Sequence, residues 1–552
     1  MSTATEDATA VSTTPCWFGS DQRALAGWLT TPRSRTCGFG IVLAPPVGPA
    51  YWPSHGTYRD LAEALAHAGH TVLRFDYDGT GDSTGSNGDP GRLTAWGSSI
   101  REAARELRSL GAPEIVLVGL RLGATLCARE AHEVGATAAV LIAPVRSGSR
   151  FAREQMLLGE PVPGPGSGAW VTGGSLLEQE TVDALSGIDL RTSEVAPAAH
   201  VLIIDMEETQ EASALVETFE GLGSAVEYRT LRGLDRVFDV PALAAERGTA
   251  LVASVTSWLS ETLPSPLEST LRGPGGRTSA RLAGGIEERF LRLGPDGLVG
   301  VVTTPARPPK ATVLLLNSGG EPHVGPGRAW VDIARGLARK GYSAVRADYG
   351  GWGESPGDTA SSLEPYHPKT LADTGAMLRA LHAAGHRRVV LLGLCASAWG
   401  ALHTVLDDVA AKEVAGVVAI NPQLYWNHGD PVEPTIGATH LARTREIKRH
   451  ALGARLQLWT LLDIIGIRHY AASWLRRLAR TRVPILLLFA ERDDGLVFLE
   501  QRTGRALDYA RTPGPIEVVE IEGLDHPLHR IWLRDRVVDT IATFLDSRVA
   551  SV

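Results

Sequence analysis

The chain repeats itself, and this internal repeat constrains its architecture more than any other feature. Three pairs of segments recur at separations of 272 to 274 residues along the 552-residue chain. The pairs are LAGWLTTP (25–32) with LVGVVTTP (298–305), LAEALAHAGHTVLRFDYDGTGDS (61–83) with IARGLARKGYSAVRADYGGWGES (333–355), and GLRLGA (119–124) with GLCASA (393–398). A fourth pair, RGLDR (232–236) and EGLDH (522–526), is 290 residues apart. A nearly constant separation that widens late predicts a duplicated domain with an insertion in the second copy.

The segment between the two copies, residues 263–285, is rich in Pro, Gly and Ser and lacks periodicity, which is typical of a linker. We therefore expect a first domain over residues 14–262 and a second domain over residues 286–548. Residues 1–13 have acidic residues and no apolar core. They are expected to form a disordered lead rather than a signal peptide.

Within each copy, short apolar runs alternate with amphipathic segments. In the second copy, TVLLLNSGG (312–320) predicts a strand that ends in a glycine-rich turn, and VDIARGLARKG (331–341) predicts a helix that stops at Gly341. Continuous apolar strands that alternate with helices indicate the α/β class, with a mostly parallel, doubly wound sheet covered on both faces. Functional residues are then expected at the carboxyl ends of the strands.

The motif GLCASA follows an apolar strand and opens a predicted helix. A strand, the pattern Gly-x-nucleophile-x-Gly and a helix form the nucleophile elbow of α/β-hydrolases, which predicts this fold for both copies. Gly393 and Ser397 are the small residues that flank Cys395, and the helix N-terminus favours the attacking thiolate. The alternatives are that Cys395 is a buried core thiol or that Ser397 is the nucleophile.

A cysteine nucleophile needs an acid and a base, which follow it in that chain order in this fold. VPILLLFAERDDGL (483–496) predicts a strand that runs into a turn with Asp493, and Asp494 is the alternative acid. Either aspartate alternatively caps the next helix. IEVVEIEGLDHPLH (516–529) predicts a strand followed by a turn that presents His526.

The predicted triad is therefore Cys395, Asp493 and His526, with His529 as a competitor for the base. Its oxyanion hole is expected to use the backbone N–H of Ala396 and one from the turn NSGGEP (317–322), near Gly320.

The first copy has Arg121 in the place of the cysteine and Arg236 in the place of the base. A guanidinium group is always protonated and cannot attack, so this copy is expected to be non-catalytic. We favour an ion pair of Arg121 with a carboxylate such as Asp78 or Glu207. The alternative is an anion site at Arg121 for a carboxylate or phosphate.

With these motifs the chain resembles the exosortase A system-associated hydrolases. The second copy resembles their first type, which has Cys in the elbow, through GLCASA, ERDDGL and GLDH. The first copy resembles their second type, which has Arg in the elbow, through LAPPVG, GLRLGA and VRSGSRFAREQ. The resemblance implies two tandem α/β-hydrolase domains fused in one polypeptide. A weaker likeness is to polyhydroxyalkanoate synthases, which also use Cys in a lipase-like box.

The insertion in the second copy predicts a helical lid at about residues 427–482, because residues 440–480 are strongly amphipathic. Its apolar residues suggest an acyl pocket. For Trp459, Trp474 and Leu475 plain helix packing is the alternative that we favour. Its Arg and Lys residues suggest contact with a phosphopantetheine group or a carrier protein.

Cys with His and Asp predicts acyl transfer through a thioester acyl-enzyme. The expected substrate is an ester or thioester, including one carried by coenzyme A or a carrier protein, and the acceptor is water, an alcohol or an amine. The alternatives are a non-catalytic binding or scaffold protein and a dienelactone-type cysteine hydrolase of small lactones.

Composition and motif content argue against several other classes of function. A net charge of −8 and a pI near 6.1 provide no basic surface for nucleic acid. The four cysteines lack metal-ligand spacing, and no nucleotide or flavin motif occurs, so no metal or cofactor is expected. No apolar stretch reaches the roughly 18–20 residues of a membrane span. We expect a cytoplasmic protein.

Overall fold

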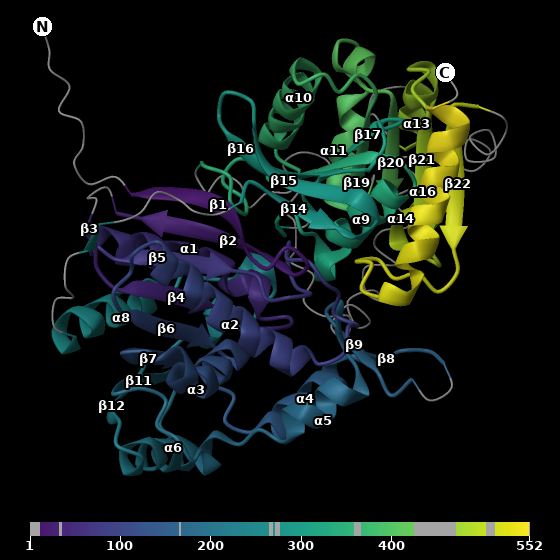
Figure 1. Ribbon diagram of the computed structural model, residues 1–552. Coiled ribbons are helices and arrows are strands. Elements are labelled where there is room, and N and C mark those ends of the chain that lie inside the picture. The colour runs from purple at the N-terminus through teal and green to yellow at the C-terminus, as the bar shows by residue number, and fades with distance from the viewer. Residues whose placement is uncertain are drawn as a thin grey trace, which may run out of the picture. The chain divides into compact units, whose positions relative to one another are not determined.

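The computed structural model describes residues 11–32, 36–164, 167–263, 269–270, 277–318, 320–357, 366–423, 471–503 and 514–550. The chain divides into two compact units, Met1–Leu282 and Ala283–Val552. Each unit contains one large sheet with helices around it (Figure 1). None of the helices in these ranges is both long and apolar enough to cross a membrane.

The sheet of the first unit has the strand order β1-β2-β5-β4-β6-β7-β11-β12. These strands are β1 (Ser12–Gly19), β2 (Ala24–Thr31), β4 (Gly40–Ala44), β5 (Thr71–Phe75), β6 (Ile115–Leu120), β7 (Ala138–Ile142), β11 (His200–Asp205) and β12 (Ala225–Thr230). Strand β2 pairs antiparallel with both of its neighbours, and the other neighbouring strands are parallel. The helices are α1 (Tyr51–His67), α2 (Arg92–Ser109), α3 (Leu122–Val134), α4 (Gly148–Leu158), α5 (Gln179–Ser186), α6 (Gln210–Gly221), α7 (Asp235–Phe238) and α8 (Thr249–Thr262).

The sheet of the second unit follows the same plan, with the order β15-β16-β18-β17-β19-β20-β21-β22. These strands are β15 (Ile286–Leu293), β16 (Leu298–Thr304), β17 (Thr312–Leu316), β18 (Ser343–Ala347), β19 (Val389–Leu394), β20 (Gly416–Ile420), β21 (Ile485–Ala490) and β22 (Ile516–Ile521). The helices are α9 (Ala329–Arg339), α10 (Pro368–Ala383), α11 (Ala396–Thr404), α13 (Ala471–Arg480), α14 (Asp494–Thr503) and α16 (Arg534–Arg548). In both units the second strand is antiparallel and the strands that follow it are parallel. Both units are therefore α/β domains with one topology.

The central strands are buried on both faces, as their unbroken apolar runs predict. In β19, Val389 and Leu391 belong to a core cluster with α10 and α11, whereas Val390 and Leu392 belong to a cluster with α9 and α16. The first unit divides in the same way between α2 and α3 on one side and α1 and α8 on the other. The doubly wound sheet with both faces covered is confirmed for each unit.

The repeat extends to buried hydrogen bonds in two corresponding loops, the one after β5 in the first unit and the one after β18 in the second. In the first unit, Ser83 Oγ donates to the carbonyl of Asp76 at 2.6 Å. In the second unit, Ser355 Oγ donates to the carbonyl of Asp348 at 2.7 Å. Each serine also accepts a backbone N–H from the antiparallel strand, β2 or β16. The two units are thus built on the same local scaffold, which supports a duplication.

Part of the predicted linker is regular structure instead. The backbone groups of Arg277 pair with those of Trp17 on β1, at 3.0 and 2.9 Å, and a strand, β14, covers Ser279–Leu282. An edge strand such as β1 presents free N–H and C=O groups, and a neighbouring segment satisfies them without needing an apolar pattern. The first unit also begins slightly earlier than expected, because β1 starts at Ser12.

The second unit contains a buried charge cluster that the sequence did not indicate. Glu288 on β15 accepts hydrogen bonds from Arg335 on α9 at 2.6 Å and from Arg346 on β18 at 3.2 Å. Glu288 and Arg346 are fully buried, and the Thr303 hydroxyl also donates to Glu288 at 2.9 Å. The cluster therefore ties β15, β16, β18 and α9 together.

We expect Glu288→Ala to lower the free energy of unfolding by about 3–5 kcal/mol, because it leaves two buried guanidinium groups without their carboxylate. Glu287→Ala is the matched control, since Glu287 is the exposed neighbour on the same strand and should change stability by only about 0.5 kcal/mol or less. Urea denaturation of the full chain measures both. Equal stability of the two variants would show that the cluster contributes little.

Candidate functional site

The elbow of the second unit is a sharp turn between β19 and α11. Cys395 occupies it with φ 56° and ψ −113°, in the strained positive-φ region that non-glycine residues rarely adopt. A Cβ on Gly393 would lie 2.3 Å from the backbone carbonyl of Ser397, so only glycine fits there. The turn therefore presents the Cys395 side chain at the carboxyl edge of the sheet, at the N-terminus of a helix.

The structure brings the three predicted triad residues together from three loops. His526, after β22, places its Nδ1 2.6 Å from Oδ2 of Asp493, after β21. Cys395 is the other neighbour of His526 that raises its pKa. Asp493 is almost fully buried, with 3% of its side chain exposed, whereas 34% of the His526 side chain is exposed. The imidazole is thus oriented by a buried carboxylate and has Cys395 as a neighbour.

The charge state of His526 follows from these neighbours. Burial lowers the pKa of His526, but hydrogen bonds to Asp493 and Cys395, together with the charges of both groups, raise it to about 10. The imidazolium form is therefore favoured near neutral pH, with Asp493 and Cys395 around it.

The alternatives to this triad fit the geometry less well. Ser397 is buried, and its hydroxyl accepts the N–H of Leu394 at 3.0 Å and donates to backbone carbonyls. Asp494 is exposed and begins α14. Asp493 also performs the capping role, because its Oδ1 accepts the N–H of Gly495 at 2.8 Å. It is His526, not His529, whose ring is bonded to Asp493.

The predicted oxyanion loop lies against the elbow. Ala396 is the first residue of α11, and Gly320 lies in a turn after β17 with φ 90°. Ser318, in the same turn, donates its hydroxyl to the carbonyl of Leu394 at 3.0 Å. The oxyanion roles of Ala396 and Gly320 stay predictions.

Sequence reasoning missed Asn421, which is hydrogen-bonded to the backbone of His526. Its Nδ2 donates to the carbonyl of His526 at 2.9 Å, and its Oδ1 accepts the N–H of Ala490 at the end of β21 at 2.7 Å. Asn421 has φ 46°, directly after β20. An Asn-Pro pair immediately after an apolar strand is the sequence signal that would have pointed to Asn421.

The predicted lid at about residues 427–482 lies mostly outside the described residues, and Trp459 is one of the positions outside them. Only α13 represents it, and there Trp474 and Leu475 are buried in the core cluster that also contains α10 and α11, so plain packing is confirmed for these two residues. The arginines at positions 476, 477 and 480 of α13 are exposed.

The first unit keeps the same elbow with a different residue in it. Arg121 has φ 55° and ψ −122°, close to the values of Cys395. A Cβ on Gly119 would lie 2.5 Å from the backbone N of Ala124, which repeats the requirement for glycine. The backbone device is thus present in both units, and only the residue at its tip differs.

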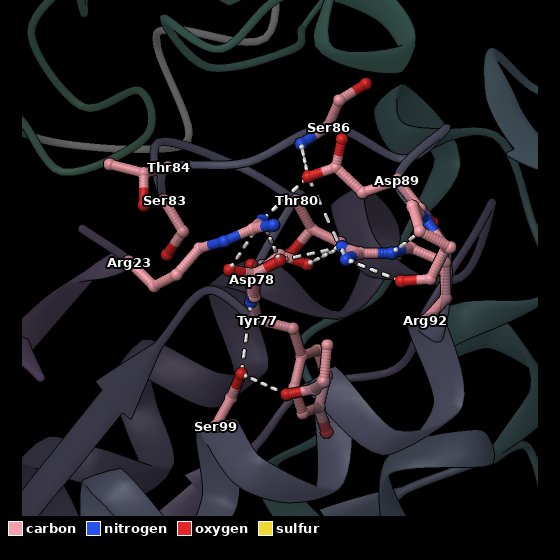
Figure 2. Close-up of polar contacts among 12 residues, drawn as sticks. Arg23, Tyr77, Asp78, Thr80, Ser83, Thr84, Ser86, Asp89, Arg92 and Ser99 are labelled. Carbon is pink, nitrogen blue, oxygen red and sulfur yellow. Dashed lines mark hydrogen bonds and ion pairs between the residues drawn. The ribbon is translucent and has the colours of Figure 1, made fainter. Parts of the chain in front are cut away.

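The predicted ion pair of Arg121 with a carboxylate is present, but its partner is Glu154 and neither Asp78 nor Glu207. Asp78 instead accepts from Arg92 at 2.7 Å and from Arg23 at 3.0 Å, a cluster that braces the loop after β5 (Figure 2). Arg121 pairs with Glu154 on α4, with Nη2 and Oε2 3.9 Å apart. The guanidinium also lies over the Phe238 ring, 5.4 Å from its centroid.

The acid and base positions of the first unit hold structural ion pairs. At the end of β11, Asp205 pairs with Arg146. Burial raises the pKa of Asp205, and the charges of Arg146 and Arg121 oppose that rise. At the base position, Arg236 is exposed and pairs with Glu246 at 3.1 Å. Arg236 thus stands where the second unit has His526, and Asp205 is paired with an arginine instead of an imidazole.

Comparisons with known proteins find likenesses among solved structures. No protein-family model matches the chain, and no curated protein matches it. Solved structures that are similar include Est1E from Butyrivibrio proteoclasticus with ferulic acid bound, at 19% identity and a TM-score of 0.36, covering 44% of this chain and 98% of that chain. The Pyrococcus furiosus esterase Pf2001 matches at 15% identity and a TM-score of 0.33, covering 48% of this chain and 94% of that chain. A dienelactone hydrolase from Anabaena variabilis matches at 14% identity and a TM-score of 0.32, covering 50% of this chain and 100% of that chain. Likenesses this weak carry no conclusion about reaction or substrate.

Proposed function

We propose that the second unit is an acyl-transfer enzyme that cleaves an ester or thioester through a covalent thioester on Cys395. One observation carries the proposal: His526 lies with Nδ1 2.6 Å from Oδ2 of buried Asp493, and Cys395, at a strained elbow, is the other neighbour that raises its pKa. This is the arrangement of an activated nucleophile, its base and the group that orients the base.

The reaction proceeds in two halves. In the first, the Cys395 sulfur attacks the acyl carbonyl carbon while His526 holds the thiol proton. The bond from that carbon to the leaving oxygen or sulfur then breaks, and the imidazolium returns the proton to the leaving group. In the second half, His526 takes a proton from water, an alcohol or an amine, which attacks the thioester and releases Cys395. Acyl transfer and hydrolysis differ only in this acceptor.

The first unit has a non-catalytic role in this proposal. Arg121 cannot attack a carbonyl, and the acid and base positions carry the ion pairs of Arg146 with Asp205 and of Arg236 with Glu246. A binding or scaffold role for the whole chain is the competing proposal. It predicts no acyl-enzyme on Cys395.

We expect Cys395→Ala to abolish the acyl-enzyme and to lower kcat/KM by roughly a thousand-fold or more, because no other group supplies the nucleophile. The protein is incubated with a panel of acyl thioesters and activated esters, and intact mass reports any adduct. Ser397→Ala is the matched control and should keep the adduct, since Ser397 is engaged with the backbone of Leu394. An adduct that persists in Cys395→Ala would contradict the proposal, and its loss in Ser397→Ala would favour the rival nucleophile.

We expect Asp493→Asn to move the alkaline limb of the acylation rate to lower pH, by about 1–3 pH units. The reason is that Asp493 helps to raise the pKa of His526 to about 10, so removing its charge lets the imidazolium lose its proton earlier. Rates of ester cleavage between pH 5 and 11 measure the limb. Asp494→Asn is the control and should leave the limb in place. The opposite result would make Asp494 the acid.

The same raised pKa predicts how stability depends on pH. Because the folded-state pKa of His526 lies above its unfolded value near 6.5, its contribution to stability is fully present below that value and is lost as the pH rises toward 10. Wild type is therefore expected to lose more stability than Asp493→Asn between pH 7 and 10, as measured by urea denaturation. An equal loss in both would contradict the assigned cause of the shift.

A further inference from the structure

A buried carboxylate holds both ends of the segment that contains the predicted oxyanion turn. Asp348 comes directly after β18, and its side chain is fully buried. Its Oδ1 accepts Nδ2 of Asn317 at 2.9 Å and the backbone N–H of His323 at 2.7 Å. Its Oδ2 lies 2.6 Å from Nδ1 of His323, which is also buried. Residues 317–323 are therefore anchored at each end to one carboxylate.

The same segment is held against the nucleophile elbow. The hydroxyl of Ser318 donates to the carbonyl of Leu394, the residue before Cys395, at 3.0 Å. Oγ of Ser397, in the first turn of α11, lies 3.3 Å from the carbonyl of Leu316 at the end of β17. The position of the turn relative to the thiol is thus set by the elbow on one side and by the buried carboxylate on the other.

The first unit has the same turn with a different residue in the place of His323. Tyr51 lies 272 residues before His323, which is the separation of the repeated segments that follow both of them. Each of the two comes three positions after a glycine with positive φ, Gly48 at 86° and Gly320 at 90°. Tyr51 and His323 therefore occupy equivalent positions of the duplicated fold.

Both residues make the same kind of contact. The hydroxyl of Tyr51 donates to Asp76, which is equivalent to Asp348 because it directly follows β5 and lies 272 residues earlier. A phenol and an imidazole have in common a polar hydrogen on a planar ring. The duplicated position has thus changed its residue and kept its bond to the aspartate, which indicates that this bond is what the turn requires.

We propose that His323 is a positioning residue for acyl transfer: by its bonds to Asp348 it holds the oxyanion turn at the distance from Cys395 at which a backbone N–H reaches the developing oxyanion. This inference rests on the proposed function. A hydrogen bond to a buried carboxylate is strong, and burial keeps water from replacing it. An oxyanion donor acts within about 2.7–3.1 Å of the oxygen, so a turn that shifts by about 1 Å loses most of its effect. His323 acts through the backbone of residues 317–323 and not by contact with the substrate.

The test compares His323→Phe with His323→Tyr, which differ by the one hydroxyl that Tyr51 uses in the first unit. Release of p-nitrophenol from an acyl ester, followed by stopped flow, measures the rate of Cys395 acylation. The rate should fall about 100-fold in His323→Phe, and His323→Tyr should recover at least about ten-fold of that loss. Tyr51→Phe is the matched control, since it removes the same hydroxyl from the unit that has Arg121 at its elbow, and it should leave the rate as it is.

A second measurement separates positioning of the oxyanion turn from general damage to the site. Iodoacetamide alkylates Cys395 at a saturated carbon, so this reaction forms no oxyanion and needs no oxyanion donor. The alkylation rate is therefore expected to be the same in His323→Phe, His323→Tyr and wild type. A merely structural role would lower the acylation and alkylation rates together.

The inference is overturned if His323→Phe acylates at the wild-type rate, or if it loses acylation and alkylation equally. It is also overturned if His323→Tyr acylates as slowly as His323→Phe, because the hydrogen bond to Asp348 would then not be what positions the turn. Each of these outcomes requires acylation of Cys395 in wild type, which distinguishes them from failure of the proposed function. If wild type forms no acyl adduct with any ester or thioester, the function and the inference built on it both fail.

Discussion

The strained turn between a strand and a helix is the constraint on which both units depend. A residue with φ near 55° costs of order 1–3 kcal/mol and persists only when the surroundings determine it. Here Gly119 and Gly393 allow the backbone to approach within 2.5 Å of where a Cβ would lie, and the parallel sheet on either side fixes the path of the chain. The turn holds one side chain at the edge of the sheet and at a helix N-terminus, near the loops that follow later strands.

The two units show what that turn does with different residues. With Cys395, the loops after β21 and β22 supply Asp493 and His526, whose side chains are hydrogen-bonded to each other. With Arg121, the corresponding loops supply Asp205, paired with Arg146, and Arg236, paired with Glu246. The change at the tip of the turn is therefore matched by changes at both partner positions.

Sequence reasoning predicted the features that local patterns encode. The repeat, the α/β topology and the elbow follow from segments of five to twenty residues, and the order of nucleophile, acid and base places Asp493 and His526 at the ends of apolar strands. Features that depend on contacts between distant side chains were missed or mistaken. Arg121 lies near Glu154, because Asp78 is already held by Arg23 and Arg92. Asn421 and Glu288 carry no periodic signal, since their importance comes from burial and from partners on other strands.

The most direct measurement is the rate at which one equivalent of iodoacetamide alkylates each cysteine of the full chain near neutral pH, read by peptide mass. Cys16 and Cys127 are buried, and burial raises the pKa of both thiols, to about 12 for Cys16. The account predicts that the label goes first to Cys395 in wild type and that His526→Ala slows this labelling by removing the imidazolium beside the sulfur. Labelling of Cys395 that is no faster than that of the buried cysteines, or that is unchanged in His526→Ala, would contradict an activated nucleophile at this elbow.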